Sequence, residues 1–443
     1  MRKPPKMGDD LQHSLLLHLN PNNTIVHSGD DLEAKINLIG TQKTWEEFKK
    51  VWRIAGPSIF CRVAMFSLTI ITQSLAGHLS DLDLAAFSIA TTLLISISFG
   101  FLILGQSAEV AERTGLVARW LIPMHLSFVF QFSLQRFLQS QLKMAIIAWS
   151  SAVALAVHAV ISWFFVYKLG VGIVGTALTL DFSWWFSVFI LCGYIFYGGC
   201  PLTWNGLSSK AFTELWDFFK LALASGVMVL LENVYYRFLV IASGGAGSSH
   251  VAVDALSICV TLFGWESMVP LGILAATGVR VAIELGAGNV NNAKFAAKVC
   301  MLTSLVIGLI FFSLVVAIPD RLAMIFTPNL SVISGVHELA VLLGSTILLN
   351  SVPPVILGIA VGSGWQVLAA YINIGSYYLV GVPLGIFIGL VLKFGYMGIW
   401  VGMLGGSLTQ IMLLAAVASK LEWEKEVLKA RGKQFMMNKA LDD

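Results

Sequence analysis

Eleven apolar runs, each about as long as a bilayer is thick, decide most of what this chain can fold into. A helix needs roughly 20 predominantly apolar residues to cross the hydrocarbon core of a membrane. The runs lie at 54–76, 84–105, 116–138, 144–167, 171–197, 219–242, 251–277, 299–318, 336–361, 367–391 and 396–419. They lack the apolar–polar alternation of membrane-spanning barrel strands, so they predict helices. The sequence therefore predicts an all-α, multi-pass integral membrane protein with about 11 spans.

The composition agrees with this prediction and excludes several other classes of protein. Of the 443 residues, 57% are hydrophobic and 12% are charged, whereas soluble domains carry about 25% charged residues. The net charge of +3 gives no indication of nucleic-acid binding. The five cysteines lie far apart without a CxxC pair, so they predict neither a disulfide framework nor a metal site. No GxxxxGK(S/T) motif and no nucleophile–base pair is present, so we expect neither a pump nor an enzyme, and no cofactor.

Basic residues flank both ends of the apolar region, which creates a conflict with the number of spans. Lysine and arginine accumulate on the cytoplasmic side of membrane proteins. The flanking residues are Lys43, Lys49, Lys50 and Arg53 before the first run, and Lys420, Lys425, Lys429, Arg431 and Lys433 after the last. Two cytoplasmic ends require an even number of spans. Either one span is miscounted or one is missing, and the consistent charges of the second-half loops place the fault in the first half.

A weak internal repeat indicates the same place. Residues 85–92 resemble 254–261, an offset of 169 residues between Ser88 and Ser257. Residues 168–178 resemble 393–404, an offset of 226 residues between Gly172 and Gly398. The repeat predicts two lobes of similar design, with the first shorter by 57 residues between these landmarks. That length is enough for one helix and its loops, and both arguments indicate the abrupt junction within 98–115.

Five short motifs in a fixed order carry a resemblance to a known family. They are "IAGPSIF" (54–60), "LQRFLQSQLK" (134–143), "GGCPLTW" (198–204), "ELGAGN" (284–289) and "VGSGWQ" (361–366). The chain resembles the plant branch of the multidrug and toxic compound extrusion (MATE) family. That resemblance implies twelve helices in two six-helix lobes and cation-coupled antiport, with protons as the coupling ion in plant members. Relatives carry a loop similar to "CGQAxGA" and a third helix where this chain runs from Gly100 directly into 104–106. The resemblance thus implies that the distal second helix, that loop and the third helix are absent.

The motifs and runs together predict how the chain is divided. We expect a cytoplasmic, mostly disordered N-terminal tail at 1–50, an incomplete first lobe at 51–199 and a cytoplasmic linker at 200–218. A second lobe of six helices follows at 219–419, and a cytoplasmic C-terminal tail at 420–443. The family resemblance favours the vacuolar or the plasma membrane and does not separate the two.

An acid inside the apolar run 219–242 is the first candidate site residue. Glu232 lies in "VMVLLENVYYRFLV" (227–240), and a charge near the bilayer centre costs roughly 2.5–3.5 kcal/mol on insertion scales. It is either a structural carboxyl hydrogen-bonded across helices or a reversible proton site. The resemblance favours the proton site, because relatives carry an acid at this point of the seventh helix. Tyr235 and Tyr236 follow at i+3 and i+4, on the same helix face, where they can bind the acid or an aromatic substrate.

Other polar residues in the apolar runs are weaker candidates. Glu266 is either a second coupling residue or a structural partner of Arg237, and Asp254 near a helix start is either a cap or an accessory residue. Many relatives have an aspartate in the tenth helix where this chain has Asn350, so that possible proton carrier is replaced. A polar face of the first lobe comprises Arg62, Gln131, Gln135, Arg136 and Gln139, and predicts either a cavity wall or an interhelical hydrogen-bond ladder. His158 lies in the middle of a run, where a satisfied structural histidine is expected.

The function predicted from the resemblance is proton-coupled antiport of organic solutes or xenobiotics, by efflux or by vacuolar sequestration. A glycosylated flavonoid is one candidate substrate, and the expected partners are the proton, a small organic solute and the lipid bilayer. We expect a monomer, with no metal and no catalytic residue. The alternative is a non-transporting product of such a gene, either a truncated splice form or a mis-predicted gene model.

Overall fold

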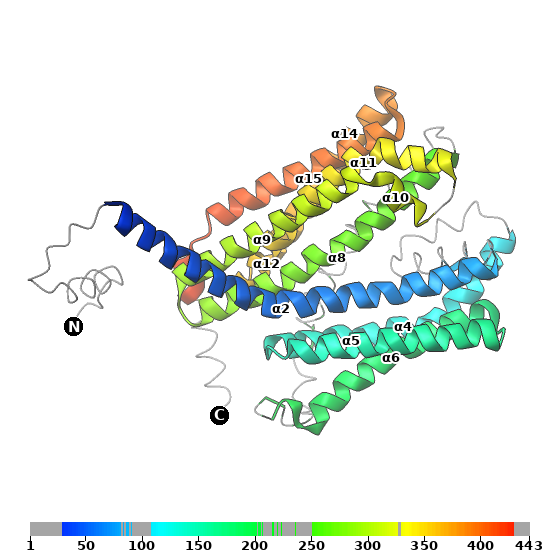
Figure 1. Ribbon diagram of the computed structural model, residues 1–443, viewed down its shortest axis with the longest axis horizontal. Helices are drawn as coiled ribbons and strands as arrows, with labels where there is room; N and C mark the ends of the chain where they lie inside the picture. The colour runs from blue at the N-terminus through cyan, green and yellow to red at the C-terminus, as the bar shows by residue number, and fades with distance from the viewer. Residues whose placement is uncertain are drawn as a thin grey trace, which may run out of the picture. The chain divides into compact units, whose positions relative to one another are not determined.

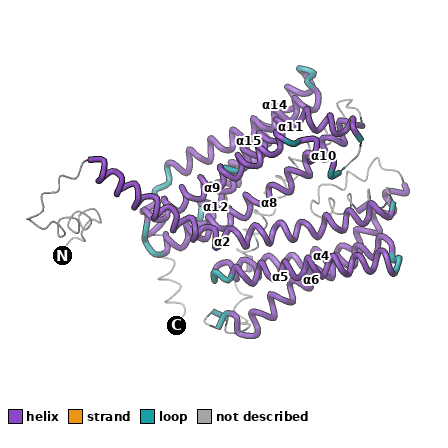
Figure 2. Tube along the Cα trace, in the orientation of Figure 1, coloured by secondary structure: helices purple, strands orange, loops and turns teal. Residues whose placement is uncertain are grey.

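The computed structural model describes most of the chain and divides it into two compact units, Met1–Lys49 and Lys50–Asp443. The architecture below is that of the second unit. The structure describes residues 29–80, 83, 86, 87, 90, 108–201, 203, 204, 206, 215, 216, 219, 223, 235, 250–326 and 329–428. It describes the backbone alone at 29–40, 77, 78, 108, 110, 111, 250–254 and 257. All regular elements within these residues are helical (Figure 2).

The described helices follow the apolar runs, with π-helical turns (η) at several helix ends. They are α2 (Gly29–Leu79), α4 (Ala108–Ser140), α5 (Met144–Trp163), η2 (Phe164–Lys168), α6 (Gly172–Tyr194), η3 (Ile195–Gly199), α8 (His250–Gly286), α9 (Val290–Ala317), α10 (Pro319–Met324), α11 (Leu330–Asn350), α12 (Pro353–Ser363), α13 (Gln366–Gly375), η5 (Ser376–Gly381), α14 (Val382–Ile386), η6 (Phe387–Val391) and α15 (Gly395–Ser419). One boundary differs from the expected tail at 1–50, because α2 already begins at Gly29.

Eight helical segments in the described part of the chain are long and apolar enough to cross a membrane. They are Thr41–Ala76, Met144–Lys168, Gly172–Gly199, Ile258–Gly286, Val290–Ala317, Leu330–Ser363, Gln366–Val391 and Gly395–Ser419. Each corresponds to a predicted run. The run 116–138 forms most of α4, whose mean hydropathy is lowered by residues such as Arg119, His125 and Gln131. The runs 84–105 and 219–242 lie mostly outside the described residues. The chain is thus a multi-pass integral membrane protein.

The first group of helices packs around α6. Both α4 and α5 lie against α6, and the three run side by side (Figure 1). The α2 helix is joined to this group by side-chain hydrogen bonds, including one of 3.0 Å between Thr72 Oγ1 and His158 Nε2. A weaker contact of 3.4 Å joins Gln135 Nε2 to Cys61 Sγ. These contacts give α2, α4, α5 and α6 one shared interior.

The second group is built on α8 and α15. The α8 helix packs against α9, α11 and α12, and α15 packs against η5, α14 and η6 (Figure 1). Small residues permit the closest approach, because a β-carbon on Gly402 of α15 would collide with the backbone of Gly385 in α14. Such glycine contacts are the usual way in which membrane helices pack closely.

Pro353 and Pro354 interrupt the helix of the apolar run 336–361 without ending its span. The α11 helix begins after Asn329, whose side chain accepts a 3.0 Å hydrogen bond from the Ser331 N–H, as an N-cap does. It ends at Asn350, and α12 begins after two intervening residues, with prolines in its first turn. The two helices still form one apolar segment of 34 residues, Leu330–Ser363. The prolines therefore bend a span and do not end it.

Candidate functional site

A carboxyl group without a hydrogen-bond partner lies inside the second lobe. The Glu266 side chain, on α8, is 5% exposed. Neither of its carboxyl oxygens has a hydrogen-bond partner in the described part of the chain. Buried polar groups are normally paired, so an unpaired carboxyl is a feature that a functional role can explain.

Two close contacts between α8 and the α11–α12 pair show which part of this pair lies beside Glu266. A β-carbon on Gly335 would lie 2.9 Å from the Ala255 Cβ, and one on Gly358 would lie 2.7 Å from the Thr277 Cβ. The α8 helix therefore runs parallel to the α11–α12 pair, and Glu266 lies midway between the two contacts along α8. Its spacing from both is close to three helical turns, so it occupies the same face of α8. Glu266 is thereby placed toward the last turns of α11.

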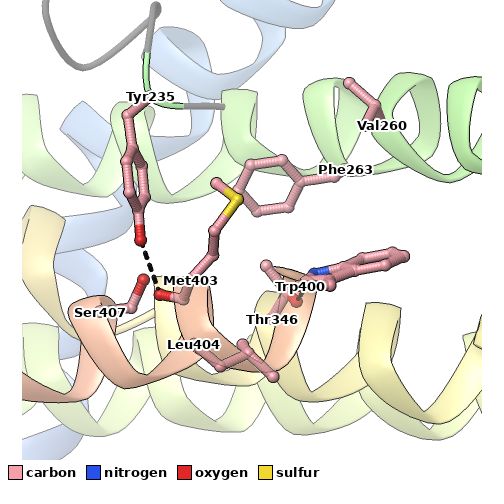
Figure 3. A pocket seen from close by; sticks show the side chains of 8 residues that line it. All are labelled: Tyr235, Val260, Phe263, Thr346, Trp400, Met403, Leu404 and Ser407. Carbon is pink, nitrogen blue, oxygen red and sulfur yellow. Dashed lines mark hydrogen bonds between the residues drawn. The ribbon is translucent and has the colours of Figure 1, made fainter. Parts of the chain in front are cut away.

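A small apolar cavity begins one turn before Glu266 (Figure 3). Its lining residues are Tyr235, Val260, Phe263, Thr346, Trp400, Met403, Leu404 and Ser407. The cavity volume is about 30 Å³, whereas sites for drug-sized molecules measure roughly 300–1,000 Å³. A water molecule needs at least about 10–15 Å³. In this conformation the cavity admits small species such as water and is too small for an organic solute.

Tyr235 closes one side of this cavity and is fully buried. Its hydroxyl donates a 2.8 Å hydrogen bond to the Met403 carbonyl oxygen (Figure 3). Its ring stacks on that of Tyr377 with 4.3 Å between centroids. The hydroxyl fits beside two glycines, because a β-carbon on Gly381 or Gly406 would collide with it. The absence of side chains at these two positions is what makes room for the tyrosine.

A chain of buried polar side chains continues from this tyrosine pair, and the sequence analysis missed it. The Tyr377 hydroxyl donates to Gln410 Oε1 at 2.9 Å, and Gln410 Nε2 donates to Asn373 Oδ1 at 2.8 Å. Asn373 and Gln410 are each 1% exposed. Both are uncharged residues inside apolar runs, at 367–391 and 396–419. An amide inside an apolar run is the same signal that marked Gln131 and Gln135, and it also marks these two residues.

The other predicted site residues are dispersed. Glu232 and Tyr236 lie outside the described residues. Only the backbone of Asp254 is described, and it is the fifth residue of α8 rather than its cap. Asn350 is the half-buried last residue of α11. Gln135 lies in the first lobe, in contact with Cys61, so the structure does not bring it to the second-lobe candidates.

The first lobe contains a buried histidine with several partners. The His158 ring contacts Thr72 Oγ1 at 3.0 Å, Ser183 Oγ at 2.9 Å and Ser162 Oγ at 3.3 Å. The Ser162 hydroxyl also donates to Thr179 Oγ1 at 3.0 Å. These residues come from α2, α5 and α6. The expectation that this histidine has hydrogen-bond partners is confirmed, and its structural role stays a prediction.

The glutamine stripe of α4 joins different helices. Gln131 Nε2 donates to Ser187 Oγ on α6 at 3.0 Å, and Gln135 Nε2 donates to Cys61 Sγ on α2 at 3.4 Å. Gln139 accepts a 3.3 Å hydrogen bond from Arg136 of the same helix. Of the two hypotheses for the stripe, the interhelical hydrogen-bond ladder therefore describes Gln131 and Gln135.

Comparison with known proteins decides the family. A family model described as MatE matches residues 224–387. Protein DETOXIFICATION 27 of Arabidopsis thaliana is 43% identical over 477 aligned positions, which cover 96% of this chain and 96% of that protein. The chain belongs to the plant MATE family. Protein DETOXIFICATION 26 of the same plant is 42% identical, over 90% of this chain and 93% of its own length.

Solved structures agree with this family. The crystal structure of the eukaryotic MATE transporter AtDTX14 matches with a TM-score of 0.83 and 27% identity, and covers 88% of this chain and 99% of that chain. This MATE protein is therefore a membrane efflux transporter and not an enzyme. The comparisons favour that function over the alternative of a non-transporting product.

The first comparison also measures how much this chain lacks. The matched 96% of its 443 residues amounts to about 425, so about 50 of the 477 aligned positions have no residue of this chain. The internal repeat indicated a first lobe shorter by 57 residues. The number of gap positions is similar to that difference, and the absence of one segment from the first lobe stays a prediction.

Proposed function

We propose that this MATE transporter exports small organic solutes in exchange for protons. Glu266 and Glu232 bind the coupling proton, and the protein acts as a monomer in the vacuolar or the plasma membrane. A glycosylated flavonoid is the proposed substrate class, on the resemblance of "LENVYYR" (231–237) to relatives linked to flavonoid transport.

The observation that supports this proposal best is the buried, unpartnered carboxyl of Glu266. A carboxylate held away from water without a partner costs several kcal/mol, which is avoided when the group carries a proton. In the conformation described here, Glu266 is therefore accommodated as the neutral acid. A conformation that exposes it to water or to a cationic solute favours release of that proton. This difference between conformations is what coupling requires, because a ligand shifts an equilibrium only through differential affinity.

The available driving force is sufficient for such an exchange. Each pH unit across the membrane supplies about 1.4 kcal/mol per proton. A gradient of two pH units can therefore oppose about a hundredfold solute gradient in one-for-one exchange.

We further propose that the two lobes comprise 51–199 and 219–419, with 200–218 as the linker and the segments 1–50 and 420–443 as cytoplasmic tails. The solute passes between the lobes. In this proposal the lobes meet where α2 contacts α8, since a β-carbon on Gly264 would lie 3.6 Å from the Phe66 ring.

The test is pH-driven transport by the purified full chain in liposomes. A pH jump imposes the proton gradient, and solute accumulation is measured for Glu266→Gln, Glu232→Gln and a control, Glu338→Gln, at an exposed position of α11. The glutamine variants keep the shape of the acid and remove its titration. We expect both site variants to lose concentrative transport and the control to retain it. Concentration of solute by both site variants at wild-type rates would show that neither acid is the coupling site.

A further inference from the structure

Two arginines without an acidic partner lie close together in the first lobe. Arg62 belongs to the apolar run 54–76, and any stretch of about 20 residues within that run includes it. A cation at such a depth normally faces a polar cavity or a partner. In the part of the chain that the structure describes, neither Arg62 nor Arg136 forms an ion pair with a carboxylate.

A contact between α2 and α4 places the two arginines at neighbouring positions on these helices. Gln135 Nε2 lies 3.4 Å from Cys61 Sγ, and each arginine is the next residue along its helix. Arg136 donates one hydrogen bond, of 3.3 Å, to Gln139 of its own helix. The pair therefore concentrates positive charge that protein groups in the described residues do not neutralise.

The pair is accessible and lies toward the second lobe. On α2, Ile59 and Phe66 contact α8, since β-carbons on Gly272 and Gly264 would lie against them. Arg62 lies three residues after Ile59 and four before Phe66, which places it on the same face of α2. Its side chain is half-buried and that of Arg136 is exposed. Neither guanidinium is fully covered by protein atoms.

We propose that Arg62 and Arg136 form a subsite for the anionic group of a transported organic solute, either a carboxylate, a sulfate or a phosphate ester. Guanidinium groups bind such anions through paired N–H donors, and they do so more strongly than neutral donors. An anion bound between the two cations offsets at least one of their charges and reduces their mutual repulsion. This inference rests on the proposed function in one respect, because it assumes that the solute is what the lobes enclose.

The test is a binding measurement on the full chain in phosphatidylcholine nanodiscs. The probe is carboxyfluorescein, followed by fluorescence anisotropy, and a cationic rhodamine ester of similar ring size is the control for dependence on the anionic group. We expect Arg62→Gln and Arg136→Gln each to weaken carboxyfluorescein binding by about tenfold or more, because each removes a charge-assisted contact. The control Arg119→Gln, at an exposed position of α4, leaves binding unchanged. Arg62→Lys retains the charge and loses less affinity than Arg62→Gln, which separates loss of charge from loss of fold.

Three outcomes overturn the proposal. In the first, the wild-type chain fails to bind carboxyfluorescein. In the second, the glutamine variants bind the dye as tightly as the wild type does. In the third, dye binding is likewise unchanged, and mass spectrometry shows that the variants no longer retain the phosphatidylglycerol that co-purifies with the wild type. In the last case the arginines bind a lipid headgroup and not a solute. Failure of the proton proposal is distinguishable, because Glu266→Gln then retains pH-driven transport while Arg62→Gln still weakens dye binding.

Discussion

The polar groups at the centre of the two lobes are satisfied to very different degrees. In the first lobe, His158 contacts hydroxyl groups from α2, α5 and α6. In the second lobe, Glu266 is also buried, and it has no hydrogen-bond partner in the described residues. A fully paired network favours one arrangement of its helices. An unpaired acid must obtain its partner from a proton, water or a solute, and thus can respond to conformational change.

The largest expected effects come from exchanging the two central residues for glutamine. Glu266→Gln should reduce pH-driven transport by more than about tenfold, while the thermal midpoint of the purified protein stays within about 2–4 °C of wild type. His158→Gln should lower the free energy of unfolding by about 1–3 kcal/mol, because several hydroxyl groups lose a buried partner. Its transport should keep the pH profile of the wild type. Measuring both transport and thermal unfolding for each variant tests this contrast between a transport defect and a stability defect.

The reverse pattern would contradict the comparison. If His158→Gln flattens the pH profile while Glu266→Gln only lowers stability, the first-lobe histidine is the titrating centre. Glu338→Gln serves as the control for transport because its side chain is exposed on α11.

A second prediction concerns glycines, and its effect is on stability alone. Gly406→Ala should lower the free energy of unfolding by about 1–3 kcal/mol, because overpacked interiors must shift to make room. The new β-carbon would lie 2.7 Å from the Tyr235 hydroxyl and 2.8 Å from the Gly381 backbone. The matched control is Gly193→Ala on α6, where the β-carbon meets no atom within 4 Å. Equal thermal midpoints for the two variants would show that the niche around Tyr235 is not tightly packed.

The comparison also shows what the sequence can predict. Long apolar runs predicted every candidate span that the structure describes, because a lipid environment permits few alternatives to a helix. Glu266 was also predicted, because a lone acid in an apolar run is conspicuous. The extension of α2 back to Gly29 was not predicted, since no apolar periodicity marks residues 29–43.

The hydrogen-bond partners of the polar residues could not be predicted from the sequence, for a different reason. The contact between Tyr377 and Gln410 joins residues 33 positions apart, and that between Thr72 and His158 joins residues 86 positions apart. Such contacts depend on helix rotation and on which helices are neighbours. Periodicity within one helix gives neither quantity, so it identified the polar residues without identifying their partners.

The smallest expected effects come from removing one ordinary buried hydrogen bond in each lobe and comparing the stability lost. Tyr377→Phe removes the donor to Gln410 in the second lobe, and Ser187→Ala removes the acceptor of Gln131 in the first. Both bonds are buried and uncharged, so each variant should lower the free energy of unfolding by about 0.6 kcal/mol, the mean for such contacts in membrane proteins. Chemical denaturation in mixed micelles measures both values under one condition. Matching losses mean that the lobes share the same background of structural hydrogen bonds, and that the contrast belongs to Glu266. A loss above about 2 kcal/mol for Tyr377→Phe alone would mean that the chain from Tyr377 to Asn373 is itself a cooperative network, and the contrast between the lobes would have to be redrawn around it.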